Sequence, residues 1–327
     1  MDVQFIYKLV VIFLYSYFVT LWSIPYVMSR LKKYGYTEFD MYKPGRERIP
    51  TLGGIALLIG ILVSLALSQV LVSIGLGEQD IGGLFIFYFI VIVYALYGVV
   101  DDLFHFRKRY DKIVALLILT FPLASLIHDT QLNLGVIHLE LGIIYSLLIV
   151  PAYVMIVANM INLHAGYNGL TQGLSLILLI TLGIKSYIVH GLAFFIYLIP
   201  ILGAVLAFFP KTFYPAKVLP GNSGDLMAGA AIGAFIVVNS FLWFGIFILI
   251  PHIINFIMDS YTILLRRKKD VKFGRVRDDG TVIPPPTMRY KSLKFLLVSM
   301  FRLTEKQATL WLYALTGVFC IAGLVLF

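Results

Sequence analysis

Long apolar segments recur along the whole of this chain, and they are the feature that most restricts its fold. Most have about the 20 residues that a helix needs to cross the hydrocarbon core of a bilayer. With 60% hydrophobic and 13% charged residues, the chain lies far outside the composition of soluble proteins. We therefore predict one all-α integral membrane domain over residues 1–327, with about ten spans. The predicted spans are 5–29, 52–74, 84–100, 113–127, 141–162, 170–184, 187–209, 226 to about 241, about 243 to 265, and 308–327.

Basic residues between these segments predict the orientation of the chain. Of its 26 Lys and Arg residues, 24 lie in the four loops 30–50, 101–112, 209–225 and 266–306. Loops rich in Lys and Arg stay on the cytoplasmic side of a membrane, so we expect these loops inside and both termini outside. The same distribution accounts for the net charge of +9, and we expect no nucleic-acid partner.

The last basic loop has a pattern of its own. Residues 271–277 and 281–284 flank the turn sequence Asp278-Asp279-Gly280, which predicts a small β-hairpin. Residues 291–302 place apolar side chains between cations, which predicts an amphipathic helix on the membrane surface.

Three polar clusters stand where apolar segments end: Asp101 with Asp102, the stretch 159–173 and the stretch 221–225. A carboxylate at mid-membrane depth costs roughly 2.5 to 3.5 kcal/mol, so the acid pair needs something that offsets this cost. A solvated helix end or ion pairs with the cations at 107–109 would do so, and so would a hard divalent cation such as Mg²⁺. Residues 221–224 can present backbone N–H groups to an anion, whereas Asp225 can equally be a helix N-cap.

Together, the three clusters and the basic loops indicate a metal and several cations around a phosphate-rich ligand at the membrane surface. Phosphoryl transfer to a lipid fits this pattern. In the first basic loop, Lys43, Arg46 or Arg48 either faces an anionic substrate or belongs to an ordinary cytoplasmic flank. His105 can share a helical face with Asp101, although a lone histidine is more often a packing or capping residue.

Motifs spread over about two thirds of the chain resemble the polyprenyl-phosphate N-acetylhexosamine-1-phosphate transferases, a family of glycosyltransferase 4 type. Ala165-Gly166, where bacterial members usually have Asp-Gly, resembles the archaeal and eukaryotic branch, and the short last loop favours an archaeal enzyme. The matching motifs are 49–54 (Ile-Pro-Thr-Leu-Gly-Gly), 98–102 (Gly-Val-Val-Asp-Asp), 159–173 (Asn-x-x-Asn-x-x-Ala-Gly-x-Asn-Gly-Leu-x-x-Gly), 215–221 (Pro-Ala-Lys-Val-Leu-x-Gly) and 251–256 (Pro-x-x-x-Asn-Phe).

The resemblance implies an activity. The enzyme would transfer GlcNAc-1-phosphate, or a related N-acetylhexosamine 1-phosphate, from a UDP-sugar to dolichyl or another polyprenyl phosphate. UMP would be released, and the product would start the assembly of a lipid-linked glycan. The resemblance also implies a requirement for Mg²⁺, with Mn²⁺ as a substitute, and an active site at the cytoplasmic face. For an archaeal enzyme it implies the cell membrane, and it is compatible with a homodimer.

The resemblance also assigns roles to residues. Asp101 and Asp102 match the acidic pair that handles the lipid phosphate. Lys112 stands next to a basic position of the family that is Asp111 in this chain. The residues expected to bind substrate are Lys43, Arg48, Asn159, Asn168, Gly169, Lys217, Asn255, Arg275 and Arg277. The last two resemble an Arg-x-Arg pair that clamps the diphosphate, but a hairpin with solvated cations explains them almost as well.

The metal ligands implied by the resemblance are Asn162 and the residue at position 222. The family has Asp at the second position, whereas this chain has Asn222. Because an amide oxygen is a weaker ligand than a carboxylate, either Asn222 still binds the metal or Asp225 has taken over the role.

Two alternatives remain. An ion-coupled transporter also has intramembrane acids and broken helices, but it would need charges nearer mid-membrane and repeat symmetry. A transferase of the same family could instead use UDP-MurNAc-pentapeptide. A CDP-alcohol phosphotransferase is disfavoured because its Asp-Gly-x-x-Ala-Arg motif is absent.

Overall fold

Twelve α-helices make up most of the part of the chain that the structure describes. That structure is a computed structural model, and it describes residues 3–43, 45, 47–76, 81–104, 109–127, 130–133, 138–262, 273–286 and 291–327. The helices are α1 (Val3–Lys33), α2 (Gly54–Ser73), α3 (Ile81–Phe104), α4 (Arg109–Leu119), α5 (Val150–Leu163), α6 (Leu170–His190), α7 (Phe195–Thr212), α8 (Gly221–Val238), α9 (Leu242–Ile248), α10 (Ile250–Ser260), α11 (Leu293–Met300) and α12 (Glu305–Leu326).

The long helices confirm the prediction of an all-α, multi-pass membrane protein. Within the described residues, eight helices are long and apolar enough to cross a bilayer, and α9 with α10 forms a ninth candidate that is bent by 68°. The segment predicted as a span at 113–127 forms the shorter helix α4 followed by a 3₁₀ helix, Phe121–Leu126. The predicted division near residue 241 is confirmed, because α8 ends at Val238 and α9 begins at Leu242.

Three antiparallel hairpins connect helices within the described residues. The predicted hairpin of the last basic loop is confirmed as β5 (Arg275–Val276) paired with β6 (Val282–Ile283). The other two hairpins were not predicted from the sequence. These are β1 (Thr37–Phe39) with β2 (Arg48–Pro50), and β3 (Gln131–Asn133) with β4 (His138–Glu140).

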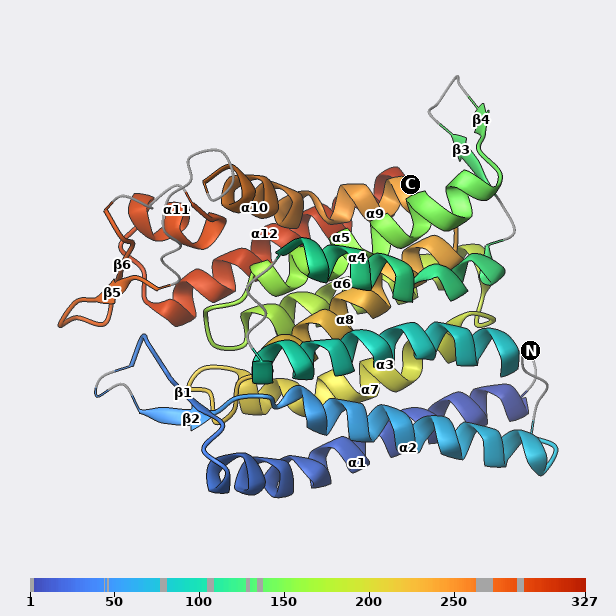
Figure 1. Ribbon diagram of the computed structural model, residues 1–327, viewed down its shortest axis with the longest axis horizontal. Coiled ribbons are helices and arrows are strands. Elements are labelled where there is room, and N and C mark those ends of the chain that lie inside the picture. The colour runs from blue at the N-terminus through green and yellow to red at the C-terminus, as the bar shows by residue number, and fades with distance from the viewer. Residues whose placement is uncertain are drawn as a thin grey trace.

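The connections gather at the two ends of the helix bundle. In Figure 1, the hairpins β1–β2 and β5–β6 and helix α11 lie at one end, which we call the hairpin end. Both termini and the β3–β4 hairpin lie at the other end. The shared position of the termini agrees with an even number of crossings between them.

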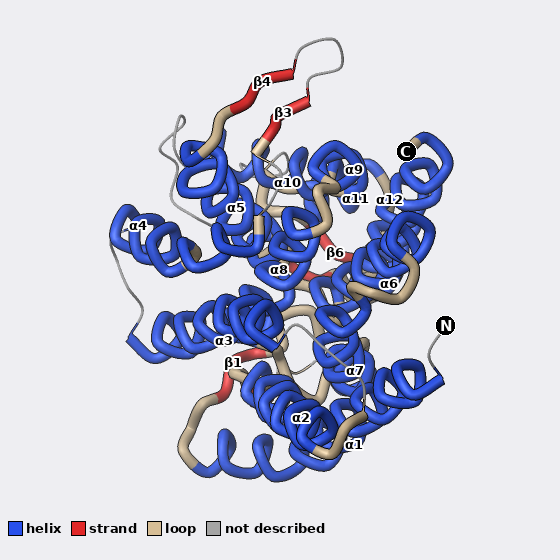
Figure 2. The backbone as a smooth tube through the Cα atoms, turned by 90° about the vertical axis from the view of Figure 1, so that its right-hand side faces the viewer, coloured by secondary structure: helices blue, strands red, loops and turns tan. Residues whose placement is uncertain are grey.

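Helix α8 occupies the interior of the bundle. Figure 2 shows it surrounded by its neighbours, and it packs against α2, α3, α5, α6 and α7. Every residue from Ser223 to Val237 is buried. Small side chains make this position possible, because they let neighbouring backbones approach closely without steric conflict.

The packing of α8 against α5 sets an antiparallel register. A Cβ atom on Gly229 would lie 2.6 Å from Cα of Ala158, and one on Gly233 would lie 3.0 Å from Cα of Val154. A step of four residues toward the C-terminus of α8 therefore corresponds to a step of four residues toward the N-terminus of α5. Because residues four apart share a helical face, the same register continued by one turn brings Asp225 level with Asn162.

Gly98 of α3 provides the closest test of this packing. A Cβ atom there would lie 2.5 Å from both N and Cα of Ser223, which are backbone atoms that cannot move aside easily. We predict that Gly98→Ala destabilises the protein by about 1 to 3 kcal/mol, the usual range for an overpacked site, and lowers its Tm in detergent.

Gly317→Ala is the matched control, because Gly317 also lies inside a helix but a Cβ atom there would contact nothing within 4 Å. Its Tm should stay the same or rise, since alanine favours a helix. Equal losses of Tm in the two variants would contradict the described α3–α8 contact.

Candidate functional site

The first turn of α8 binds the acid pair at the end of α3. The backbone N–H of Asn222 donates to Oδ2 of Asp102 over 2.9 Å, and its Nδ2 donates to Oδ2 of Asp101 over 3.1 Å. Amides in the first turn of a helix have no partner within the helix and carry a partial positive charge. The cluster at 221–225 therefore meets the pair at 101–102, and the anion at this helix start is the carboxylate of Asp102.

Helix α8 begins earlier than the predicted span. It starts at Gly221, with Pro220 as its N-cap, so Asp225 lies in its second turn and is not the cap residue. The backbone of the 50–54 motif fixes this start: the N–H groups of Gly53 and Gly54 donate to the carbonyls of Leu219 and Pro220, each over 2.8 Å. Tertiary hydrogen bonds thus hold a helix start whose own residues are weak helix formers.

Glycine is required at position 221 for two reasons. Its φ is +69°, a conformation that side chains with a Cβ atom rarely adopt. A Cβ atom would also lie 2.6 Å from Oδ2 of Asp102. The acid pair can approach the start of α8 only because this residue has no side chain.

Asp225 is buried beside the start of α6. Thr171 donates its hydroxyl to Oδ1 of Asp225 over 2.6 Å, and Gln172 donates its Nε2 to the same oxygen over 2.9 Å. Asp225 also lies close enough to Asp102 for their charges to interact. The carboxylates from α3 and α8 therefore belong to one site.

The two asparagines of α5 differ in their surroundings. Asn162 is half-buried in the last turn of α5, level with Asp225 in the α5–α8 register. Asn159 donates its Nδ2 to the carbonyl of Met155 over 2.8 Å, so its amide is bound to its own helix. Of the two, Asn162 is the residue that the α5–α8 register brings level with Asp225.

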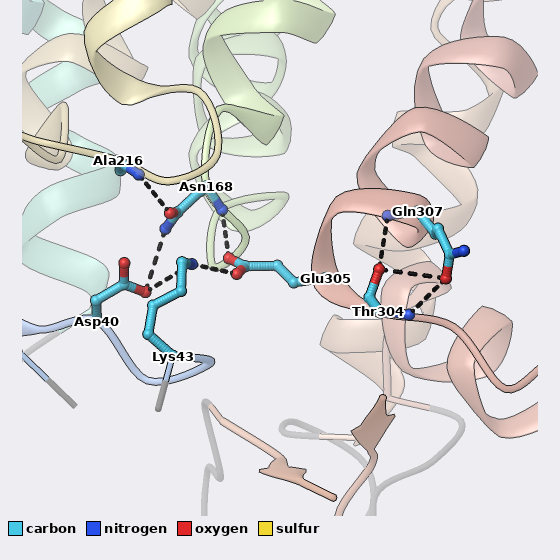
Figure 3. Close-up of polar contacts among 7 residues, drawn as sticks. All are labelled: Asp40, Lys43, Asn168, Ala216, Thr304, Glu305 and Gln307. Atoms are coloured by element: carbon cyan, nitrogen blue, oxygen red, sulfur yellow. Dashed lines mark hydrogen bonds and ion pairs between the residues drawn. The ribbon is translucent and has the colours of Figure 1, made fainter. Parts of the chain in front are cut away.

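Asn168 is the centre of a second polar network, shown in Figure 3. Its N–H donates to Oε1 of Glu305 over 2.6 Å, its Nδ2 donates to Oδ1 of Asp40 over 3.3 Å, and its Oδ1 accepts the N–H of Ala216 over 2.8 Å. Lys43 pairs with Asp40 over 3.1 Å and with Glu305. Asn168 and Lys43, both predicted to bind substrate, thus hold four separate segments together at the hairpin end.

Asp40 and Glu305 were not predicted from the sequence. Glu305 follows Thr304, and Thr304 with Gln307 forms a capping box that begins α12. The spacing of these two polar residues before an apolar run is a recognisable helix start, so it could have placed Glu305 in the first turn. We find no comparable signal for Asp40.

The remaining predicted substrate residues have varied environments. Lys217 and Arg275 are exposed, and exposed Arg277 donates to the hydroxyl of Thr281 over 3.1 Å. Arg48 lies over the ring of Phe39, with 4.4 Å from its Cζ to the ring centroid.

Two predicted residues have structural contacts. Gly169 has a φ of +74°, and its carbonyl accepts a hydrogen bond from the hydroxyl of Tyr313 over 2.6 Å. Asn255 is buried, and its Oδ1 accepts the N–H of Leu293 over 3.0 Å. Lys112 lies in the first turn of α4, while Arg46 and His105 lie outside the described residues.

Helix α11 confirms the predicted helix of the last loop. Two cations of the predicted segment 291–302 are nevertheless buried. Lys294 is buried and donates to the carbonyl of Ala165, and buried Lys291 lies 3.4 Å from Asp259 of α10. The loop after α5 is therefore held from α11 as well as from α12.

Two histidines beside that loop are fully buried and pack edge to face. The ring centroids of His164 and His252 lie 4.8 Å apart. Burial lowers the pKa of His164 well below its usual range, so this imidazole is neutral at physiological pH. Neither histidine was predicted from the sequence to have a role.

The polar groups around the start of α8 fit a hard divalent cation. Carboxylate and amide oxygens come from Asp101, Asp102, Asn162, Asn222 and Asp225. Mg²⁺ takes such oxygens and commonly uses one or two protein carboxylates together with phosphate oxygens. In the described part of the chain no three His, Cys, Asp or Glu side chains form a metal cluster, so a site here would depend on amide and phosphate oxygens.

Comparisons with known proteins point in one direction. Residues 84–240 match the model of glycosyl transferase family 4. A relative from Sulfolobus acidocaldarius, provisionally named a UDP-N-acetylglucosamine–dolichyl-phosphate N-acetylglucosaminephosphotransferase, is 29% identical over 81% of this chain and 80% of its own length. A relative of the same name from Saccharolobus solfataricus is 27% identical over 96% of this chain and 94% of its own length. The phospho-N-acetylmuramoyl-pentapeptide-transferase of Streptococcus thermophilus is 27% identical over 70% of this chain and 71% of its own length.

The Asn168 network yields a prediction about coupling. Lys43 and Glu305 are largely buried, with side chains 11% and 2% exposed. A double-mutant cycle with Lys43→Met and Glu305→Gln should give a coupling energy of about 1 to 3 kcal/mol in unfolding, as is usual for residues in one network.

The exposed pair Arg302–Asp279, 2.5 Å apart with side chains 68% and 40% exposed, is the control. Its cycle, with Arg302→Met and Asp279→Asn, should give about 0 to 1 kcal/mol because solvent screens the charges. A coupling for Lys43 and Glu305 no larger than that of the exposed pair would refute the network.

Proposed function

The chain belongs to glycosyl transferase family 4, and on that premise we propose that it transfers N-acetylglucosamine 1-phosphate from its UDP derivative to dolichyl or another polyprenyl phosphate. The proposal includes transfer of a closely related N-acetylhexosamine 1-phosphate in place of N-acetylglucosamine 1-phosphate. UMP is the second product, and the lipid product starts a lipid-linked glycan. The names of the two relatives from Sulfolobus and Saccharolobus support the choice of sugar and lipid.

One structural observation supports the proposal most strongly. The start of α8 binds the acid pair of α3 through the backbone and side chain of Asn222, with Asp225 one turn further on. This arrangement sets carboxylates and amide oxygens at one end of the bundle. Such a set would hold a divalent cation to which two phosphorylated substrates can bind at the membrane surface.

The chemistry is a displacement at phosphorus. An oxygen of the lipid phosphate attacks the β-phosphorus of the UDP-sugar, the bond from that phosphorus to the bridging oxygen breaks, and UMP leaves with the electron pair. Asp101 or Asp102 orients the lipid phosphate or accepts its proton. Positioning and charge stabilisation account for most of the catalysis of such transfers.

Mg²⁺, or Mn²⁺ in its place, would be held by Asn162 with Asn222 or Asp225, and it would neutralise negative charge on the diphosphate. The exposed cations Arg48, Lys217, Arg275 and Arg277 lie on segments of the hairpin end. Their field draws anionic nucleotides toward this end of the bundle. Lys112 stays a predicted member of the catalytic set.

The basic loops favour the hairpin end as the cytoplasmic face, with both termini on the outer side. An archaeal origin, a place in the cell membrane and assembly as a homodimer stay predictions. The similarity to the Streptococcus transferase favours a second candidate donor, UDP-MurNAc-pentapeptide. A transporter is less well supported, since the acids cluster at one end of the helices.

The acid pair gives the direct test. In purified protein supplied with UDP-GlcNAc, Mg²⁺ and polyprenyl phosphate, we predict that Asp101→Asn and Asp102→Asn each lower UMP release at least about 100-fold, the lower range for a positioned acid or base. The measurement is the initial rate of UMP formation, with the lipid product identified by mass.

Glu140→Gln is the control, because exposed Glu140 lies on β4 at the opposite end of the bundle and the change also removes one carboxylate. It should leave the rate unchanged. Near wild-type rates in both Asp variants would end the catalytic assignment. A panel of UDP-sugars identifies the donor, and substrate flux in liposomes without UMP release would favour the transporter.

A further inference from the structure

Among the described residues, the hydrogen bonds to Asp225 reach one of its two carboxylate oxygens. The hydroxyl of Thr171 and the Nε2 of Gln172 both donate to the same oxygen, Oδ1. Both donors come from the first turn of α6, which begins at Leu170. Two donors on one oxygen fix the plane of the carboxylate and direct Oδ2 elsewhere.

The donors of Asn222, by contrast, are used by the acid pair. Its backbone N–H binds Asp102 and its Nδ2 binds Asp101. Its neutral Oδ1 is therefore what Asn222 can offer a cation, whereas Asp225 can offer a negatively charged oxygen. The two residues, one turn apart on α8, have different surroundings.

Gln172 supplies an independent observation. Its side chain is fully buried, and among the described residues its Oε1 has no hydrogen-bond partner. A buried acceptor without a partner destabilises the fold, because it has lost its hydrogen bonds to water. The amide cannot simply be turned over, because Oε1 would then face the carboxylate of Asp225. Since Nε2 of the same amide binds Asp225, a ligand beside Asp225 is in a position to supply a donor to Oε1.

We propose that Thr171 and Gln172 are positioning residues that make Asp225 the carboxylate ligand of a divalent cation, while Asn222 positions Asp101 and Asp102. A water molecule of the hydrated cation donates to Oε1 of Gln172, since Mg²⁺ usually keeps several of its waters. Partners of this kind, which orient a ligand without touching the metal, typically change metal affinity 10- to 100-fold when they are removed.

The register of α5 and α8 supports the position of the cation. Asn162 lies level with Asp225 on the neighbouring helix, and its half-buried side chain lies in the last turn of α5. The cation would therefore lie between α5, α6 and α8, beside the acid pair. The inference rests on the proposed function, because that function supplies the cation and the phosphates.

The test measures metal binding directly. Purified protein in detergent, without nucleotide or lipid, is titrated with Mn²⁺, and the free ion is followed by its electron paramagnetic resonance signal. We expect Thr171→Val and Gln172→Met each to raise the Kd for Mn²⁺ at least about 10-fold. Thr171→Ser, which keeps the hydroxyl, should restore the affinity, and Asp225→Ala should weaken binding more than Asn222→Ala does.

Thr181→Val is the matched control. It makes the same change in the same helix at another buried site, where the hydroxyl donates to the carbonyl of Ile177 over 2.7 Å. Its Kd should equal that of the wild type. An unchanged Kd in Thr171→Val and Gln172→Met overturns the proposal, as does an equal change in Thr181→Val or a larger effect of Asn222→Ala than of Asp225→Ala.

A second measurement separates positioning from general damage. In the UMP assay, Thr171→Val and Gln172→Met should each need at least about 10-fold more Mg²⁺ for half-maximal rate. Both variants should approach the wild-type kcat at saturating Mg²⁺. A lower kcat with an unchanged Mg²⁺ requirement would overturn the proposal.

Failure of the proposed function is distinguishable from failure of this inference. Wild-type protein that binds Mn²⁺ through Asp225 yet releases no UMP contradicts the proposed function and leaves the role of Thr171 and Gln172 intact. Wild-type protein that releases UMP, while Thr171→Val and Gln172→Met bind Mn²⁺ normally, contradicts the positioning role alone.

Discussion

The contact between the acid pair of α3 and the first turn of α8 is the interaction on which the rest of the site depends. Carboxylates at the end of a membrane helix need partners that lipid cannot provide. Here the partners are the N–H and amide groups of Asn222. The same contact satisfies free amides of α8 and holds two acids together, so one interaction serves the stability of the bundle and the chemistry of the site.

Close backbone packing makes this interaction possible. A Cβ atom on Gly54 would lie 2.2 Å from the backbone N of Gly224, and one on Gly98 would lie 2.5 Å from the backbone N of Ser223. Helices α2 and α3 therefore touch the start of α8 without intervening side chains. Further along α8, its contacts with α5 bring Asn162 level with Asp225. The small residues in the motifs thus determine which polar groups meet, although they carry no chemistry themselves.

A second set of contacts joins the loops around the site. Lys43 and Glu305 are 262 residues apart in the sequence, yet they pair beside Asn168. Lys294 adds a further link from α11 to the carbonyl of Ala165. The loop that follows Asn162 is therefore held by the last basic loop, by α12 and by the loop after α1. A substrate bound here would contact segments whose positions depend on one another.

The sequence predicted the features that depend on local pattern. Apolar length predicted the spans, and Asp278-Asp279-Gly280 predicted the β5–β6 hairpin. The position of the polar clusters at the ends of apolar segments predicted that residues 101–102 and 221–225 would meet. The start of α8 at Gly221 was missed because Gly-Asn-Ser-Gly has low helix propensity and is held by the backbone of residues 50–54. The burial of Lys291 and the pairing of Lys43 with Glu305 depend on distant segments, which periodicity does not report.

The central claim is that the ends of α3, α5, α6 and α8 surround one divalent cation. The most direct measurement is anomalous X-ray diffraction from crystals of the purified protein grown with Mn²⁺. The account predicts a single anomalous peak within ligand distance of Asp225 and Asn162, beside Asp101 and Asp102. A peak bound elsewhere, or none at a Mn²⁺ concentration that supports UMP release, would contradict it.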